Sequence, residues 1–228
     1  MTKNLFITGT GTDIGKTFIS ALIVKKLHDA GYRSAYYKAA VSGNVRDAQG
    51  HLIPGDAALV KKISHIPQEV SEMVPYIYEN AVSPHLASRM EGSPVELSVV
   101  KDGYEKVKAD HDFITMEGSG GILCPIRWDE QKIWLEDIIQ ALHMPCIIIA
   151  EAGLGTINSA VLTYEYMKQH GMKVKGFIFN HFHPGDIMEE DNKKMVEERT
   201  GLPVLACVQE GDIELNMPAE QLAELYEE

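Results

Sequence analysis

The residues best suited to chemistry lie near the N-terminus, in the segment Gly9-Thr10-Gly11-Thr12-Asp13-Ile14-Gly15-Lys16-Thr17. An apolar, strand-like run precedes this segment, and a helical periodicity follows it. Glycines let backbone N–H groups turn toward an anion, and the N-terminus of a helix adds partial positive charge. Lys16 can reach terminal phosphates, and the Thr17 hydroxyl can ligate Mg²⁺. The segment therefore predicts a phosphate-binding loop for a nucleoside triphosphate.

The glycine spacing of this loop is irregular. The common pattern, Gly-x-x-x-x-Gly-Lys-Ser/Thr, would place glycine at position 10, where this chain has Thr10. Five residues separate Gly9 from Gly15 instead. An ordinary strand-to-helix turn that happens to contain Gly-Lys-Thr is the alternative interpretation, but the strand before it and the helix after it favour a phosphate loop.

Two more charged residues end predicted strands. Lys38 ends the apolar run 34–38, and Ser42 begins a long polar stretch, so an ammonium and a hydroxyl are expected near the phosphate loop. Glu117 ends the run 113–117 and precedes Gly118-Ser119-Gly120-Gly121. Mg²⁺ bridged between phosphates takes one or two carboxylates, which makes Glu117 a candidate ligand. A lysine that merely caps its strand is the alternative for Lys38.

Three other positions allow a binding role or a purely structural one. Asp56 precedes the helical periodicity 57–64 and could serve only as its N-cap. The segment 152–158 follows a predicted strand and starts a helix. Its free N–H groups could form a second anion site, suited to a carboxylate, or the segment could be an ordinary strand-to-helix turn. Asn180 ends another strand and could bind a purine edge through its amide or stand as a polar turn residue.

Histidine and cysteine show no metal-binding pattern. His181 and His183 alternate without a further ligand cluster, which is typical of surface or turn residues. Cys124, Cys146 and Cys207 form no Cys-x-x-Cys pair, so a reducing, cytoplasmic location is expected. Cys124 has no recognisable histidine partner and is expected to be a core or edge thiol.

The bulk composition fits one large α/β domain over residues 1–228. The chain is 45% hydrophobic and carries a net charge of −12 with no basic run, which argues against nucleic-acid and anionic-membrane partners. No apolar stretch reaches the length of a signal peptide or a bilayer span, so a soluble protein is expected.

Alternating strands and helices must position these residues. Strands are expected at 4–8, 34–38, 113–117, 145–150, 174–180 and 203–208, and helices at 17–30, 57–64, 95–109, 133–142, 157–170 and 187–199. This alternation predicts a doubly wound, mostly parallel sheet that binds ligands at its carboxyl edge. The polar stretch 41–55 is long enough to be functional, and 73–94 is expected to form a lid or a helical excursion beside the site. The tail 218–228 is expected to be a short acidic helix exposed to solvent.

With these residues, the chain resembles the dethiobiotin synthetase family of the P-loop NTPase superfamily. The resemblance spans most of the chain and rests on GTGTDIGKT at 9–17, Lys38 with Ser42-Gly43, GDAAL from 55, EGSGG at 117–121, LGTIN at 154–158 and FN at 179–180. That family has the same five-residue glycine spacing, so the irregular spacing supports the resemblance. Two positions depart from the family pattern: Asp13 stands where glutamate is frequent, and Ala39 where proline is common.

The resemblance implies a cyclo-ligase of biotin biosynthesis. Its substrates would be 7,8-diaminononanoate (7,8-diaminopelargonate), CO₂ or bicarbonate, and MgATP, and its products dethiobiotin, ADP and phosphate. An amine would trap CO₂ as a carbamate, which ATP would convert to a carbamic-phosphoric anhydride before the second amine closes the ring. The family also implies a homodimer in which the partner subunit holds the substrate's carboxylate tail.

The resemblance further implies a role for each matching residue. Lys16 and Lys38 would be catalytic, and Thr17, Asp56 and Glu117 would hold Mg²⁺. ATP would be bound by Gly11, Thr12, Asp13, Ile14, Gly15, Lys16, Thr17, Phe18, Glu117 and Asn180. Substrate would be bound by Asp13, Ser42, Gly118, Gly155, Thr156, Ile157 and Asn158, with Asp13 the least secure contact because its side chain is one methylene shorter than glutamate.

Two other functions remain alternatives at this point. An ATP-dependent amidotransferase or amide-forming ligase would also phosphorylate an oxygen, but it needs an ammonia source, and no glutaminase-like second domain fits this length. A dimeric ATPase switch of the ParA and MinD group would carry a second lysine early in the phosphate loop, where this chain has Gly9 and Thr10.

Overall fold

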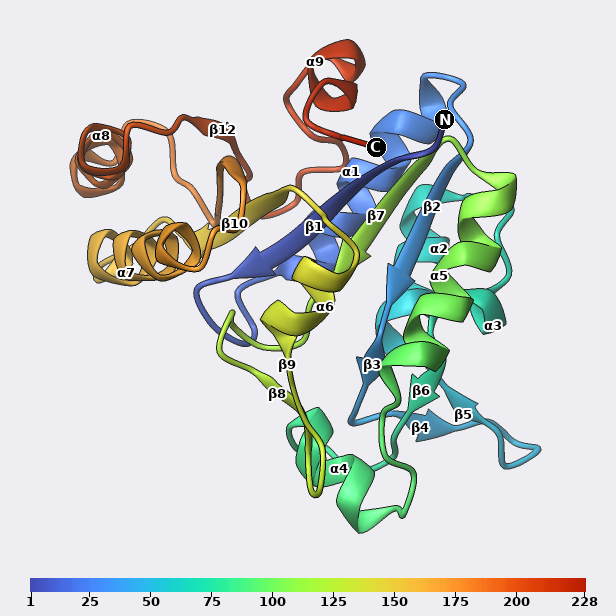
Figure 1. Cartoon of the computed structure of the whole chain (residues 1–228). Helices are drawn as coiled ribbons and strands as arrows, with labels where there is room; N and C mark the ends of the chain where they lie inside the picture. The colour runs from blue at the N-terminus through green and yellow to red at the C-terminus, as the bar shows by residue number, and fades with distance from the viewer.

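The computed structural model describes residues 1–228 and is built around one sheet of six parallel strands (Figure 1). Their spatial order is β12-β11-β10-β1-β7-β2. The bounds are β1 Lys3–Gly9, β2 Ser34–Lys38, β7 Phe113–Glu117, β10 Cys146–Glu151, β11 Val174–Asn180 and β12 Val204–Cys207. All six predicted strands are confirmed, with ends within two residues of those expected.

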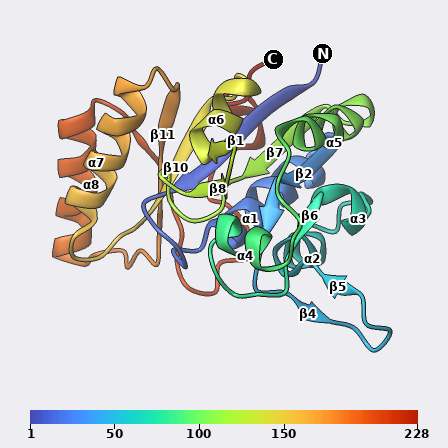
Figure 2. The ribbon, with the colours of Figure 1, turned by 60° about the horizontal axis from the view of Figure 1, so that its bottom comes forward.

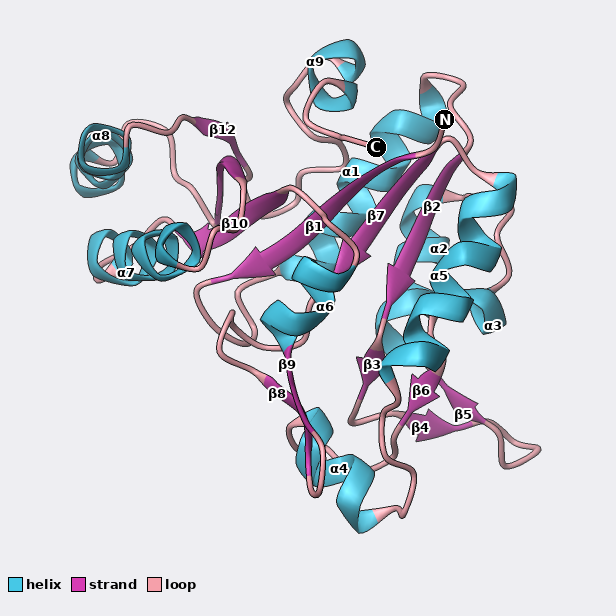
Figure 3. Cartoon of the chain, viewed as in Figure 1, coloured by secondary structure: helices cyan, strands magenta, loops and turns pink.

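Helices cover both faces of this sheet, which makes three layers (Figure 3). On one face, apolar side chains of the sheet pack with α1 Lys16–Asp29, α2 Gly55–Ser64, α3 Val70–Met73 and α9 Ala219–Ala223. On the other face they pack with α5 Leu97–Asp110, α6 Leu135–Ala141, α7 Thr156–Gln169 and α8 Ile187–Thr200. Because both faces are covered, the strands read as continuous apolar runs rather than as an alternating pattern.

Short accessory strands extend beyond the carboxyl edge of the sheet (Figure 2). The pairs are β3 Ala40–Val41 with β6 Tyr76–Ile77, β4 Val45–Arg46 with β5 Leu52–Ile53, and β8 Pro125–Trp128 with β9 Lys132–Trp134. The helix α4, Pro84–Met90, lies in the segment 73–94, so the predicted helical excursion is confirmed. The polar stretch 41–55 is largely the β4–β5 hairpin.

The start of one helix and the exposure of the tail differ from what was expected. The helix expected from residue 133 begins at Leu135, because Ile133 and Trp134 pair in β9 instead. The tail is not simply exposed to solvent: Leu222 and Tyr226 are buried against the core. The Tyr226 hydroxyl lies 2.6 Å from Oγ1 of Thr115, which fastens the tail to the sheet.

The chain order creates a crevice at the carboxyl end of β1. After β1 the chain continues to β2 and β7 on one side, and then to β10, β11 and β12 on the other. Loops that leave neighbouring strands in opposite directions open a space between them, where ligands of doubly wound folds bind. The structure contains no helix whose length and apolar character would suffice to cross a bilayer.

Candidate active site

The loop between β1 and α1 adopts the tight geometry expected of a phosphate cradle. Asp13 and Gly15 both have positive φ, 58° and 85°. A Cβ on Gly15 would lie 2.1 Å from Nδ2 of Asn180, so backbone conformation and space both require glycine there. The same Asn180 amide donates to the carbonyl oxygen of Ile14 at 3.1 Å, and so braces the loop from β11.

Lys16 lies inside this loop. Its side chain is buried, and Nζ donates to the carbonyl oxygen of Gly11 at 2.6 Å. Burial lowers the pKa of Lys16 below its ordinary value, because the charged form loses hydration, while Glu117 partly counters this effect. An anion that accepts from Nζ would restore part of the lost solvation.

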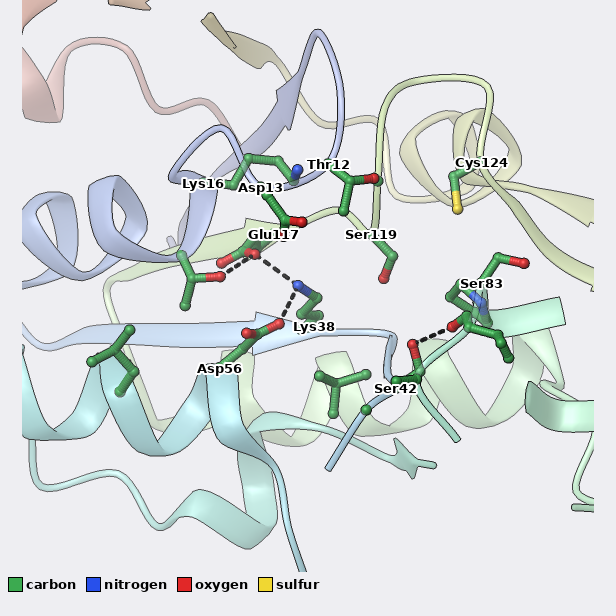
Figure 4. A pocket seen from close by; sticks show the side chains of 18 of the residues that line it. Thr12, Asp13, Lys16, Lys38, Ser42, Asp56, Ser83, Glu117, Ser119 and Cys124 are labelled. Atoms are coloured by element: carbon green, nitrogen blue, oxygen red, sulfur yellow. Dashed lines mark hydrogen bonds and ion pairs between the residues drawn. The ribbon is translucent and has the colours of Figure 1, made fainter. Parts of the chain in front are cut away.

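Lys38, Asp56 and Glu117 meet at the carboxyl edge of the sheet (Figure 4). Nζ of Lys38 lies 2.6 Å from Oδ2 of Asp56 and 2.7 Å from Oε1 of Glu117. The same Oε1 accepts from the Thr17 hydroxyl at 2.9 Å, which links the phosphate loop to the group. Residues from β2, α2, β7 and α1 thus converge on one point.

Opposing electrostatic effects act on Lys38. Burial favours the neutral amine, but the carboxylates of Glu117 and Asp56 outweigh it and raise the pKa of Lys38 above its ordinary value. The side chain is therefore an ammonium at neutral pH, a fixed positive charge beside the phosphate loop.

The remaining oxygen of Glu117 has its own partner. The Tyr36 hydroxyl donates to Oε2 of Glu117 at 2.9 Å, and Tyr36 is fully buried. Burial, followed by the charge of Glu117, raises the pKa of Tyr36 well above its ordinary value, so the hydroxyl keeps its proton and acts as the donor.

A cavity of about 750 Å³ contains these groups. It suits a nucleotide and a small second substrate, since ligand pockets span roughly 300–1,000 Å³. Its lining residues come from the phosphate loop, the ends of β2 and β7, α2 and the start of α4: Thr12, Asp13, Gly15, Lys16, Thr17, Phe18, Lys38, Val41, Ser42, Gly43, Asp56, Leu59, Ala81, Val82, Ser83, Pro84, Glu117, Ser119, Gly120 and Cys124.

Some predicted site residues do not line this cavity. The N–H of Gly118 donates to the carbonyl oxygen of Ile7 at 2.9 Å, and a Cβ on Gly118 would lie 2.7 Å from Leu135. The N–H of Gly118 is therefore already hydrogen-bonded within the sheet, and the next two residues, Ser119 and Gly120, line the cavity instead. The other predicted residues outside the lining are Gly11, Ile14, Gly155, Thr156, Ile157, Asn158 and Asn180.

Other lining residues were missed in the sequence. Ala81 to Pro84 form one wall, and the carbonyl oxygen of Val82 accepts from the Ser42 hydroxyl at 2.6 Å. The proline-rich segment 73–94 predicted that a helical excursion would lie beside the site, but it did not indicate which residues of the segment would line the cavity. Cys124 also lines the cavity, and burial raises its pKa to about 11, so it is a thiol at neutral pH.

The histidine pair lies elsewhere. His181 and His183 are exposed residues of the loop after β11, as expected of surface residues, and each contacts a different carboxylate, Glu151 and Glu189 respectively.

The donor set around Lys38 fits a magnesium ion. Carboxylate and hydroxyl oxygens are ligands that Mg²⁺ prefers, and Asp56, Glu117 and Thr17 supply them. The two carboxylates are close enough for one cation, the ammonium of Lys38, to contact both. Three acidic and two basic side chains line the cavity, so it needs additional positive charge to accept a triphosphate.

Comparisons with known proteins agree with this geometry. A protein family described as an AAA domain matches residues 3–214. ATP-dependent dethiobiotin synthetase BioD of Brachyspira hyodysenteriae is 50% identical over 217 residues, which are 95% of this chain and 96% of that protein. The enzyme of the same name from Clostridium botulinum is 46% identical over 228 residues, covering all of both chains.

Solved structures with the same fold are more distant. A chain of the MinC:MinD cell division protein complex of Aquifex aeolicus superposes with a TM-score of 0.55 at 12% identity, covering 91% of this chain and 81% of that one. A ParA family ATPase of Chlorobium tepidum gives 0.52 at 12% identity, covering 92% and 84%. They show that this chain shares its fold with these two proteins. The two dethiobiotin synthetases are 50% and 46% identical to this chain over nearly its whole length, and this chain therefore belongs to the family of ATP-dependent dethiobiotin synthetases.

Proposed function

We propose that this pocket uses ATP to phosphorylate the carbamate of 7,8-diaminononanoate and so closes the ureido ring of dethiobiotin. The observation that carries the proposal is the position of Lys38, a buried ammonium in one cavity with the phosphate loop. Reaction between an anionic carbamate and an anionic triphosphate needs fixed positive charge at the point where they meet. Family membership supports the same activity.

The chemistry balances in three steps. One amine adds to CO₂ and loses a proton, which gives a carbamate. A carbamate oxygen attacks the γ-phosphorus, and ADP leaves. The second amine then attacks the carbamoyl carbon and loses a proton, the ring closes, and phosphate leaves with the former carbamate oxygen. Phosphorylation thus supplies the leaving group that a carbamate lacks.

Lys16 and Lys38 would each stabilise a different part of the negative charge of the substrates. Lys16 donates from within the loop, where the β- and γ-phosphates would lie. Lys38 extends from β2 on a flexible four-carbon stem, and can contact the carbamate and the γ-phosphate together. Both charges are already in place before reaction, so little reorganisation is needed when charge shifts in the transition state.

Thr17, Asp56 and Glu117 would hold Mg²⁺. The ion would neutralise part of the phosphate charge when bound. The hydrogen bond from Thr17 to Glu117 keeps the hydroxyl of the loop beside the carboxylate of β7, so that ligands from two elements stay together.

Asp13 and Ser42 would orient the diamine. Asp13 lines the cavity, and its positive φ is one that aspartate adopts more readily than most residues. The Ser42 hydroxyl donates to Val82, which leaves its lone pairs free to accept from an amine. Both are placed to hold an amino group.

A homodimer would complete the substrate site. Gly155 to Asn158 lie outside the cavity of their own chain, so they would bind the carboxylate tail of substrate in the partner subunit. Near them, Leu154 is 90% exposed and Ile187 of α8 is 88% exposed. A second copy that covered these side chains would remove apolar surface from water.

Three free cysteines are consistent with an enzyme of the cytoplasm.

Phosphate release tests the function. Purified protein is incubated with MgATP, with and without bicarbonate and diamine, and dethiobiotin is measured by mass spectrometry. The proposal requires phosphate release that depends on both substrates and equals dethiobiotin formed. Release independent of the diamine would indicate an ATPase switch of the kind whose fold this chain shares, and release with another amine or acid would indicate a different ligase.

A further inference from the structure

Tyr36 has no assigned role in the proposed reaction, yet it completes the hydrogen bonding of Glu117. Oε1 of Glu117 accepts from Thr17 and Lys38, and Oε2 accepts from the Tyr36 hydroxyl at 2.9 Å. Each carboxylate oxygen therefore has its own set of donors. The hydroxyl group does not line the cavity and cannot act on substrate directly.

Strand register places these three side chains on one face of the sheet. Tyr36 and Lys38 are two residues apart in β2, so they point the same way. Lys38 is the register partner of Glu117 in β7, and Tyr36 is the partner of Thr115. Tyr36 thus approaches Glu117 diagonally from the neighbouring strand, on the side away from the cavity.

Tyr36 is itself held firmly. Its N–H donates to Oε1 of Gln68 at 2.9 Å, and its carbonyl oxygen accepts from Nε2 of Gln68 at 3.0 Å. The buried amide of Gln68 thus replaces the missing neighbour of β2, the edge strand of the sheet. The aromatic ring packs among apolar side chains of α1, α2 and α3.

We propose that Tyr36 is a positioning residue, whose hydroxyl fixes the Glu117 carboxylate so that Oε1 faces Thr17 and Lys38, where it would serve as a ligand of Mg²⁺. This inference rests on the proposed function. The terminal torsion of a glutamate is broad, so the carboxylate needs a second contact to hold one orientation. A partner that orients a metal ligand typically contributes about 10- to 100-fold to metal affinity.

The chain provides a matched control in the next residue. Tyr37 is also fully buried in β2, but its hydroxyl donates to the carbonyl oxygen of Val100 at 2.8 Å, on the opposite face of the sheet. Tyr37→Phe and Tyr36→Phe each remove one buried hydroxyl from the same strand. Only Tyr36→Phe removes a contact with a metal ligand.

The test measures Mn²⁺ affinity in the presence of ADP by electron paramagnetic resonance, together with the Mg²⁺ dependence of turnover and the melting temperature. Tyr36→Phe is expected to raise the Mn²⁺ dissociation constant by about 10-fold or more, while Tyr37→Phe leaves it unchanged and only lowers the melting temperature. Unchanged Mn²⁺ affinity in folded Tyr36→Phe would overturn the proposal, as would an equal loss in Tyr37→Phe.

A second variant covers the case in which Tyr36→Phe does not fold. Gln68→Met removes both contacts to the Tyr36 backbone but leaves the hydroxyl, so a smaller loss of Mn²⁺ affinity is expected, and an unchanged affinity would contradict the proposal. Failure of the proposed function is distinguishable: the wild-type chain would then make no dethiobiotin, while the Mn²⁺ measurement still tests Tyr36.

Discussion

Lys38 and Glu117 are 79 residues apart in the chain, yet Nζ of one lies 2.7 Å from Oε1 of the other. They are register partners at the carboxyl ends of β2 and β7. Both side chains are almost fully buried, at 6% and 1% exposure. A buried pair of this kind is weak support for stability, because desolvation offsets much of the attraction. Its position beside the phosphate loop favours a role in chemistry instead.

Lys38→Ala is expected to reduce turnover by about 10²- to 10³-fold, the range for loss of one preorganised charge-stabilising donor. Single-turnover phosphoryl transfer, measured by rapid quench, isolates this step. Lys25→Ala, which removes a partly exposed lysine of α1 paired with Asp29, is the control and should keep normal turnover. Near-normal phosphoryl transfer in Lys38→Ala would refute the role assigned to Lys38.

Gly15→Ala in the phosphate loop should reduce stability and ATP binding more than Gly31→Ala in the turn after α1. Both glycines have similar positive φ, 85° and 86°, but only a Cβ at Gly15 meets another group, the Asn180 amide. Gly31→Ala should cost about 1 kcal/mol from backbone conformation alone. Chemical denaturation and ATP titration measure both variants. Gly15→Ala should cost less stability in an Asn180→Ala background than in the wild type, because the group that the new Cβ would meet is then absent. An equal cost in both backgrounds would show that steric conflict is not the cause.

Cys124→Ser should keep turnover within about 3-fold of the wild type, since a thiol pKa raised by burial leaves little thiolate to act as a nucleophile. The pKa of about 11 also sets the alkylation rate. The thiolate fraction is low at pH 8 and rises toward pH 11, so modification by iodoacetamide should accelerate over that range. Mass spectrometry of the Cys124 peptide follows the modification. Labelling that is already rapid at pH 8 and does not accelerate toward pH 11 would be inconsistent with a buried thiol.

Tyr226→Ala should destabilise the fold by about 3–5 kcal/mol, the usual cost of truncating a buried aromatic side chain. Its ring packs edge-on against Phe113, and its hydroxyl contacts Thr115. Glu224→Ala, at an exposed position of the same tail, should change stability by no more than about 0.5 kcal/mol. Equal stability of the two variants would mean that the tail is a solvated element after all.

Sequence patterns anticipated the sheet because its strands are buried on both faces and bounded by polar residues. They also anticipated Lys38 and Glu117, since residues that end parallel strands meet at one edge. The Tyr36 contact could not be foreseen, because it depends on the register between β2 and β7, which no local pattern encodes. The burial of Tyr226 was missed for a similar reason: its partners Phe113 and Thr115 lie more than a hundred residues earlier.

The fate of one oxygen atom tests the central claim most directly. The reaction is run with ¹⁸O-labelled bicarbonate, diamine and unlabelled MgATP, and the phosphate released is analysed by mass spectrometry at early times, before exchange with water removes the label. If a carbamate oxygen attacks the γ-phosphorus, phosphate must carry one ¹⁸O atom, and the ureido carbonyl of dethiobiotin must carry another. Unlabelled phosphate formed alongside labelled dethiobiotin would show that water attacks ATP, and would contradict carbamate phosphorylation.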